Sequence, residues 1–163
     1  GPACLVLDVK MPGLSGLDFQ QELTSMNYII PVIFITGHGD IPMSVQAMKK
    51  GAIDFLSKPF DDDELLEAVK VALLKNSQAR VNLNEKKHIM QRLGSLTARE
   101  HEILTYLITG MLNKQIAYEL KISERTVKAH RKQVFDKMGV NSIAELVRLT
   151  EKVGVKPAAP GTQ

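Results

Sequence analysis

The sequence lacks the features that mark secreted and membrane-spanning proteins. It has one cysteine in 163 residues, so no disulfide can form within the chain. No apolar run approaches the roughly 20 residues that a membrane-spanning helix needs, and no basic stretch followed by an apolar one opens the chain. Tryptophan is absent, but apolar residues make up 44%, which is enough for a packed core. We therefore expect a reduced, cytoplasmic protein without a membrane anchor.

The charges are distributed unevenly along the chain. Residues 1–75 contain 6 Lys and 10 acidic residues, a balance of −4. Residues 76–163 contain 15 Lys and Arg and 8 acidic residues, a balance of +7. An acidic half joined to a basic half predicts two domains, with the basic one facing a polyanion. The alternative is that the charges are scattered by chance over solvated faces. Sequence motifs are needed to distinguish the two interpretations.

The first half alternates short apolar runs with helical patterns. Runs without polar alternation are typical of strands buried on both faces of a parallel sheet. Ser15, Pro42 and Asp61 stand where three helices would begin. This order predicts an α/β architecture with three parallel strands over residues 1–75. The apolar runs are residues 3–7, 32–35 and 53–56.

The second half has only helical patterns. The polar, proline-free stretch 76–95 predicts a helical linker, and residues 96–152 predict an all-α domain of four helices. The tail 153–163 is rich in Pro and Gly, which predicts disorder. Each of the four helices follows a residue that can cap it. These residues are Thr97 (with Glu100 in a capping box), Asn113, Ser123 and Ser142.

Two of these helices are separated by about three residues, which indicates a helix-turn-helix. On the second of them, Lys128, Arg131 and Lys132 are spaced i, i+3, i+4 and share a face. A helix that is cationic on one side and apolar on the other can lie in a DNA major groove and reach bases or phosphates. From charge alone, a solvated helix in a small bundle is an equal alternative. The apolar side carries Val127, Val134 and Met138.

The segment from Leu96 to Leu149 resembles the LuxR-type helix-turn-helix domain along its whole length. The matching motifs are LTARE, NKQIA, SERTVKAHR and AELVRL. The resemblance implies that the third helix enters the major groove of double-stranded DNA. It also implies that Lys128, Ala129 and Lys132 face bases, and that Thr126 and Arg131 lie nearer the DNA backbone. At the helix starts, Asn113, Lys114 and Ser123 are further candidates for backbone contact, because helix N-termini bind phosphates.

The stretch LVLDVKMPGLSG resembles the third strand and loop of a response-regulator receiver domain, and the likeness covers residues 3–75. It implies that Asp8 accepts a phosphoryl group from a sensor histidine kinase. Sites in open α/β sheets form at the carboxyl ends of strands, where Asp8, Thr36 and Lys58 all stand. The resemblance assigns the Thr36 hydroxyl and the Lys58 ammonium to the phosphoryl oxygens. It also implies a cis peptide before Pro59 and a mobile aromatic ring at Phe55.

The sequence departs from the receiver pattern in its metal ligands. A receiver begins with a strand that ends in adjacent acidic residues binding Mg²⁺, and no residue before Asp8 supplies this acidic pair. Asp8 and the backbone carbonyl of Lys10 are the matching ligands, too few for a hard divalent cation. We therefore expect a flavodoxin-like receiver remnant without its first two strands, of marginal stability or completed by another chain. Mg²⁺ would bind in a full-length parent, and no cofactor would bind in this chain.

Together the two halves resemble response regulators of the FixJ-like group. This resemblance implies a DNA-binding transcription regulator, favours an activator, and implies a homodimer on phosphorylation or on DNA. One alternative is an output-only DNA-binding fragment that is insensitive to phosphorylation. Another is an enzyme with an aspartyl-phosphate intermediate. Phosphatases of that kind carry a second Asp two positions after the nucleophile, where this chain has Lys10, so we do not expect an enzyme.

Overall fold

The computed structural model describes residues 1–37 and 41–159. The chain divides into two compact units, Gly1–Leu83 and Asn84–Gln163. Their boundary falls inside one long helix, α3 (Asp62–Gly94). The stretch 76–95 is therefore helical, as its composition predicts, but its two ends belong to two different units.

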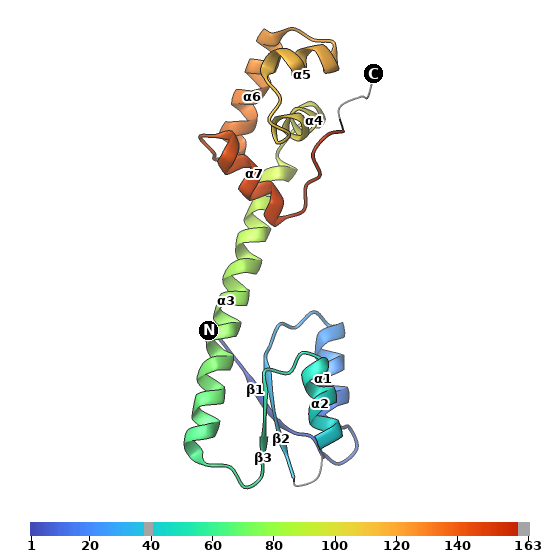
Figure 1. Ribbon diagram of the computed structural model, residues 1–163, viewed down its shortest axis with the longest axis vertical. Helices are drawn as coiled ribbons and strands as arrows, with labels where there is room; N and C mark the ends of the chain where they lie inside the picture. The colour runs from blue at the N-terminus through green and yellow to red at the C-terminus, as the bar shows by residue number, and fades with distance from the viewer. Residues whose placement is uncertain (38–40, 160–163) are drawn as a thin grey trace. The chain divides into compact units, whose positions relative to one another are not determined.

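The first unit is a three-stranded parallel sheet with helices on both faces, as the sequence predicts. Its strands lie in the order β1-β2-β3. Helices α1 and α2 cover one face of the sheet, and the first part of α3 covers the other (Figure 1). The elements are β1 (Leu5–Asp8), α1 (Gly16–Ser25), β2 (Val32–Thr36), α2 (Ile41–Lys49) and β3 (Asp54–Ser57).

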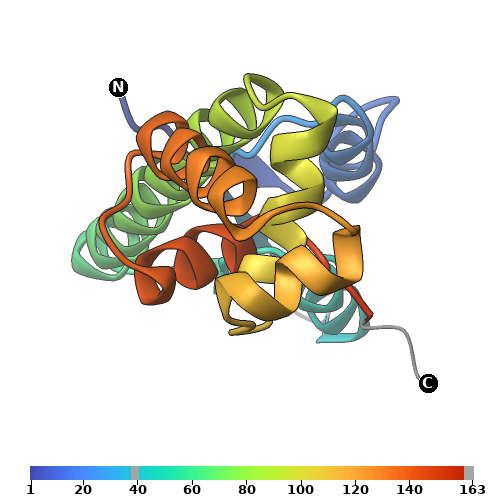
Figure 2. The same ribbon diagram turned by 90° about the horizontal axis from the view of Figure 1, so that it is seen from above.

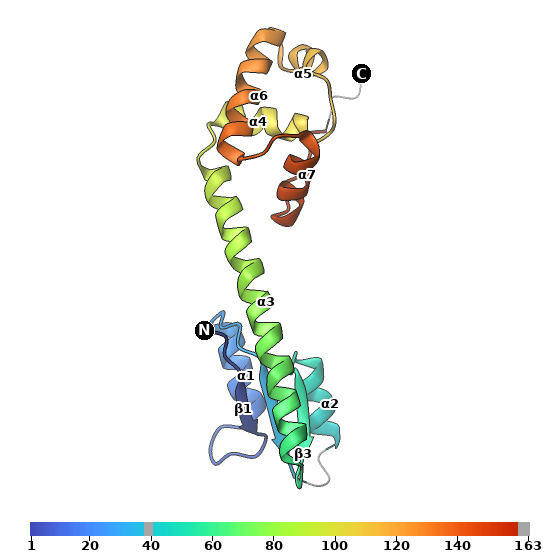
Figure 3. The ribbon, with the colours of Figure 1, turned by 90° about the vertical axis from the view of Figure 1, so that its left-hand side faces the viewer.

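The central strand explains the two small cores of this unit. Successive side chains of a strand point to opposite faces, so Phe34 packs with α1 and α2 while Ile33 packs with α3. Both side chains are completely buried. Figure 3 shows α3 in front of the sheet, with α1 and α2 behind it. Ala68 and Ala72 let α3 approach the sheet closely, because their side chains are short.

A buried amide ties the middle of α3 to the first unit. The Asn76 side chain is nearly inaccessible, with its Oδ1 accepting from the N–H of Ala3 at 3.0 Å. Its Nδ2 donates to the carbonyl of Ile29. A buried amide must be hydrogen-bonded to avoid a desolvation penalty, and here both ends are satisfied. The first unit thus extends beyond the predicted end at residue 75.

The second unit is a bundle of four helices around one core (Figure 2). The predicted caps Thr97, Ser123 and Ser142 each accept a backbone N–H, and Thr97 forms the capping box with Glu100. The helices are α4 (Ala98–Leu107), α5 (Asn113–Leu120), α6 (Glu124–Met138) and α7 (Ile143–Lys152).

The predicted cap at Asn113 is wrong. The N-cap of α5 is Leu112, whose backbone N–H is satisfied by Oε1 of Gln115 at 2.8 Å. Asn113 is the first helical residue, and its Oδ1 accepts a hydrogen bond from Arg131 instead. A side chain at the helix start can satisfy either its own helix or a neighbour, and the sequence does not say which.

The end of α3 is part of the second core. Ile89 and Leu93 are buried there, and the guanidinium Nη1 of Arg92 donates to the carbonyl of Met138 at 3.0 Å. That carbonyl lies in the last turn of α6, where a helix leaves its acceptors unpaired and favours a positive charge. The last turns of α3 therefore hold the C-terminal end of α6.

The first residues of the predicted disordered tail lie against the same bundle. Val153 and Val155 pack on the core, and the N–H of Ala158 donates to the carbonyl of Thr105 at 3.0 Å. The composition suggested disorder, but the two valines bury apolar surface that offsets the cost of ordering the chain. Residues 160–163 lie outside the described part of the chain.

Candidate functional sites

The first candidate site is at the carboxyl edge of the sheet. Asp8 ends β1, Thr36 ends β2, and Lys58 directly follows β3. The Nζ of Lys58 lies 2.7 Å from Oδ2 of Asp8, and the backbone N–H of Lys10 donates to Oδ1 of Asp8 at 2.9 Å. The parallel register brings together two charged residues that are 50 positions apart in the sequence.

These contacts stabilise the charged form of Asp8. The Lys58 ammonium, and after it the Lys10 backbone N–H, hold the pKa of the Asp8 carboxyl below its ordinary range. Asp8 is therefore an ionised, partly exposed carboxylate at neutral pH. As the pH falls through this lowered pKa, Asp8 is protonated and its ion pair with Lys58 is lost.

Three other predicted residues surround this corner. Thr36 is buried, and its hydroxyl donates to the carbonyl of Gly37 at 3.0 Å. Phe55 on β3 is 38% exposed. The peptide bond between Lys58 and Pro59 is cis, as the resemblance implies.

Gly16, which was not among the residues predicted from the sequence, supports this corner. Its backbone N–H donates to the carbonyl of Val9 at 3.2 Å, and a Cβ added at Gly16 would lie 2.6 Å from the carbonyl oxygen of Asp8. The same Cβ would lie 2.9 Å from the ring of Phe34. The sequence contains one indication of this role. Glycine directly follows the N-cap Ser15, and glycine in a helix is unfavourable unless a larger side chain would not fit.

Gly16→Ala is expected to destabilise the first unit by about 1–3 kcal/mol, because α1 must move away from the end of β1. At an open helical position the same change would stabilise, since alanine is the better helix former. Amide hydrogen exchange in β1 and β2 measures the effect. Gly37→Ala is the control, because a Cβ there would meet no atom of residues 1–37 and 41–159 within 4 Å. Equal exchange rates in the two variants would contradict the close approach.

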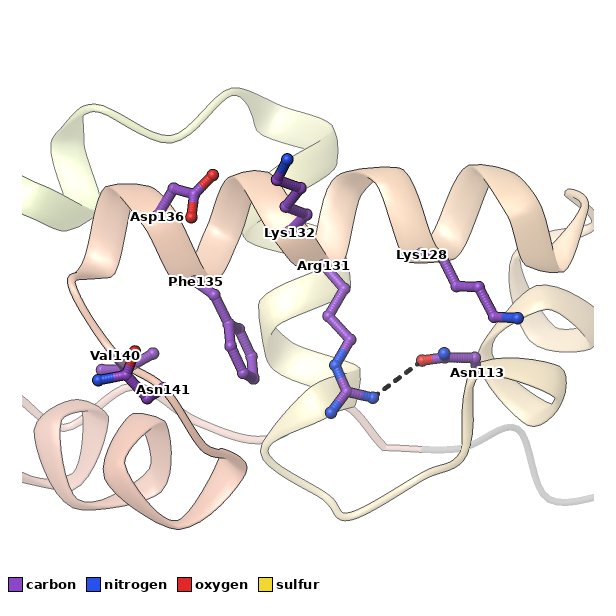
Figure 4. A pocket seen from close by; sticks show the side chains of 8 residues that line it. All are labelled: Asn113, Lys128, Arg131, Lys132, Phe135, Asp136, Val140 and Asn141. Carbon is purple, nitrogen blue, oxygen red and sulfur yellow. Dashed lines mark hydrogen bonds between the residues drawn. The ribbon is translucent and has the colours of Figure 1, made fainter.

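The second candidate site is an open groove along α6, shown in Figure 4. Arg131 extends from α6 to α5, where its Nη1 lies 3.1 Å from Oδ1 of Asn113. The guanidinium also lies over the ring of Phe135, one turn further along α6, at 5.2 Å from the ring centroid. Lys128 and Lys132 are exposed and line the same groove. The predicted cationic face therefore exists as one surface, reinforced by a residue from the preceding helix.

The start of α6 presents further polar groups beside this groove. The Oγ of Ser123 accepts from the backbone N–H of Thr126 at 3.1 Å, and the two hydroxyls lie 2.8 Å apart. Ala129, on the next turn, is exposed. At the start of α5, Lys114 is also exposed. Lys121 turns the chain between the two helices with a left-handed backbone, φ 52°.

A buried carboxylate holds α6 against α4. The Oε2 of Glu100 lies 2.7 Å from Nζ of Lys137 and accepts the backbone N–H of Thr97 at 2.8 Å. The Lys137 hydrogen bond, and after it the Thr97 N–H, hold the pKa of Glu100 below its ordinary value of 4.5. One carboxylate thus closes the capping box of α4 and anchors the last turns of α6.

This arrangement predicts acid sensitivity of the second unit. A lowered folded-state pKa means that Glu100 contributes its stabilisation fully above pH 4.5 and loses it as the pH falls through the lower folded value. Glu100→Gln should lower the melting temperature at neutral pH and flatten its decline in acid. Glu102→Gln, which alters an exposed pair with Arg99 on the same helix, is the control and should retain the decline. An unchanged acid profile in Glu100→Gln would refute this role.

Comparison with known proteins identifies the family of each unit. The family described as response regulator receiver domain matches residues 1–70, and the family described as bacterial regulatory proteins, luxR family, matches residues 94–150. FixJ of Azorhizobium caulinodans, a transcriptional regulatory protein, is 43% identical over 159 residues, which cover 98% of this chain and 75% of that protein. The chain belongs to the FixJ-like response regulators.

Other relatives of this response regulator support the same assignment. Nodulation protein W of Bradyrhizobium diazoefficiens is 50% identical over 94% of the chain. The structure of the response regulator StyR superposes with a TM-score of 0.80 at 49% identity, covering 93% of this chain and 77% of that one. The chain spans about two thirds of the length of the first curated relatives, 67% of nodulation protein W and 66% of TodT of Pseudomonas putida.

The family assignment bears on the other expectations. The FixJ-like proteins are two-component response regulators and transcription factors, so an aspartyl-phosphate enzyme is not supported. A LuxR-type domain implies DNA binding, and a receiver domain implies a sensor kinase as partner. Among residues 1–37 and 41–159, no helix is both long and apolar enough to cross a membrane.

Receiver domains typically bind Mg²⁺, but the described residues do not fit such a site on their own. None of them form a cluster of three or more His, Cys, Asp or Glu side chains. At the corner, Asp8 supplies one carboxylate, and its Oδ2 is engaged by Lys58. A hard divalent cation needs several oxygen ligands, so Asp8 and the Lys10 carbonyl are at most part of a ligand set.

Proposed function

We propose that α6 enters the major groove of double-stranded DNA and reads its sequence. Lys128, Ala129 and Lys132 would face the bases. The observation that supports this proposal is the open groove of α6, which is lined by three cationic side chains, those of Lys128, Arg131 and Lys132, and by one carboxylate, Asp136. Cationic side chains on one helix face can reach both base acceptors and phosphates.

The DNA backbone contacts would come from the edges of the same surface. Their shared feature is a position at a helix start or on the wall of the groove, where backbone N–H groups and positive charge favour phosphates. These residues are Asn113, Lys114, Ser123, Thr126 and Arg131.

Asp8 is the proposed phosphoacceptor, with a sensor histidine kinase as the donor. Its support is the ionised carboxylate beside Lys58, whose ammonium would pair with the added phosphoryl charge. Thr36 and Phe55 would then change position, and Pro59, next to Lys58, would support the phosphoryl site. The three strands would correspond to the last three of a receiver, and Mg²⁺ would require further ligands in a full-length parent.

The regulator would act in the cytoplasm as a homodimer, formed on phosphorylation or on DNA. The surface of α2 and the start of α3 would mediate this contact. A dimer places two weakly binding domains on two half-sites at once, which raises the affinity for the pair. The likeness to FixJ favours an activator.

A second candidate is a DNA-binding protein that is insensitive to phosphorylation. It is favoured by the single carboxylate that the described residues bring to the corner. Both candidates use the same α6 surface, so they differ only in the behaviour of Asp8.

Two experiments test these proposals. Selection from a library of random DNA duplexes should yield one enriched sequence, and its absence would contradict base reading by α6. Intact-protein mass spectrometry after incubation with a small phosphodonor and Mg²⁺ should show a phosphoryl adduct that is missing in Asp8→Asn. If no adduct forms in the unmutated chain, the phosphorylation-insensitive candidate replaces the regulated one for this chain.

A further inference from the structure

The guanidinium of Arg131 is held on two sides in the α6 groove. The ring of Phe135 lies beneath it at 5.2 Å, and Oδ1 of Asn113 accepts from its Nη1 at 3.1 Å (Figure 4). An exposed arginine samples many rotamers, and ordering it on binding costs free energy. Here two neighbours hold the side chain in place before any ligand arrives.

We propose that Asn113 and Phe135 are positioning residues for DNA binding, which act through Arg131 instead of touching DNA themselves. This inference rests on the proposed function and revises the direct backbone contact assigned to Asn113. In this arrangement Arg131 binds the phosphate, Asn113 orients the guanidinium, and the ring of Phe135 supports the face of the guanidinium.

The hydrogen-bonding capacity of the two side chains supports this division of roles. A guanidinium has five N–H donors in a rigid plane, and Asn113 accepts one of them, so an edge is left for phosphate oxygens. The Oδ1 of Asn113 is an acceptor and cannot bind a phosphate oxygen, which also accepts. The bond to Arg131 therefore uses the half of the amide that a phosphate could not use.

The placement of Asn113 strengthens the argument. It is the first residue of α5, yet it does not cap that helix: the N-cap is Leu112, and the Oδ1 of Asn113 accepts from Arg131. The Asn113 side chain has no capping role to explain its presence. Its bond to Arg131 instead joins α5 to α6 across 18 positions of the sequence.

A double-mutant cycle on DNA affinity tests the inference. Fluorescence anisotropy with a labelled duplex of arbitrary sequence would be recorded at several salt concentrations. The proteins are the unmutated chain, Asn113→Ala, Arg131→Ala and the double variant. Arg131→Ala should reduce the slope of log affinity against log salt by about one, because one phosphate contact is lost. Asn113→Ala should weaken binding in the unmutated background and have no further effect in the Arg131→Ala background.

The aromatic support is tested separately. Phe135→Leu keeps an apolar side chain but removes the ring face, and should weaken binding by about two- to five-fold. Phe135→Tyr, which keeps the ring face, should bind DNA as tightly as the unmutated chain. These variants leave α5 untouched, so the inference stays testable if Asn113→Ala unfolds α5. Asn84→Ala, an exposed asparagine on α3, and Arg148→Ala, an exposed arginine on α7, are the matched controls.

The outcomes separate the inference from the proposed function. Additive losses from Asn113→Ala and Arg131→Ala, each with its own change in salt slope, would overturn the inference in favour of a direct Asn113 contact. A lowered melting temperature for Asn113→Ala with unchanged DNA affinity would overturn it in favour of a structural role. Failure of the unmutated chain to bind any duplex would overturn the proposed function itself.

Discussion

Lys128→Ala is expected to weaken binding to the selected DNA sequence by about 1–3 kcal/mol and to relax specificity at one base pair. The physical reason is that a base contact discriminates, whereas a phosphate contact is the same at every sequence. Lys128 is exposed on the α6 groove, so its removal should leave the fold unchanged. Competition between the selected duplex and single-base variants of it measures both effects.

Arg131→Ala is the matched comparison on the same helix. It should weaken binding to the selected duplex and to its variants by the same factor, because Arg131 is expected to contact the DNA backbone. The ratio of specific to non-specific affinity therefore separates the two variants. If Lys128→Ala and Arg131→Ala lower all affinities by the same factor, the proposed docking of α6 in the major groove is wrong.

Ile89→Ala is expected to destabilise the DNA-binding unit by about 2–5 kcal/mol, although residue 89 lies outside the predicted helix-turn-helix domain. Ile89 is 2% exposed and packs in the same core as Ile103, Val134 and Leu146. Removing three carbon atoms from such a site forfeits burial and leaves a cavity. Amide hydrogen exchange in α4 and α6 of the whole chain would report the loss.

Met90→Ala provides the control for this prediction. Met90 is the next residue on α3 but is 56% exposed, so its truncation should change stability by no more than about 0.5 kcal/mol. If both variants left α4 and α6 equally protected from hydrogen exchange, the end of α3 would be a linker and not part of the second core. A protein shortened to begin at Leu96 should be less stable than one that begins at Asn84, for the same reason.

The elements of the fold could be predicted from local sequence patterns. Capping residues such as Ser15, Thr97 and Ser123 act on backbone groups within three positions, so the sequence contains the whole interaction. Apolar runs likewise marked the three strands, but the expectation of burial on both faces holds only for the central β2. In the outer strands β1 and β3, Val6 and Phe55 are exposed. The helical spacing of Lys128, Arg131 and Lys132 placed them on one face of α6.

Errors arose where a residue had two possible partners. Asn113 could cap α5 or form a hydrogen bond to a neighbouring helix. Because α5 packs on α6, its side chain accepts a hydrogen bond from Arg131. The tail from Val153 onward has a composition typical of disorder, yet its valines pack on the core of the bundle. Composition predicts whether an isolated segment is ordered. When the segment packs on a neighbouring surface, the burial of its apolar side chains can offset the conformational entropy that it loses.

Local patterns in the sequence were enough to predict the two-domain organisation and the order of strands and helices, because periodicity and capping act over a few residues. The candidates Asp8, Thr36 and Lys58 came from the resemblance to receiver domains. Only the tertiary structure showed that Gly16 must lack a side chain, that Ile89 belongs to the second core, and that Asn113 holds Arg131. Those facts are distances between atoms far apart in the sequence, and close packing of whole elements sets them.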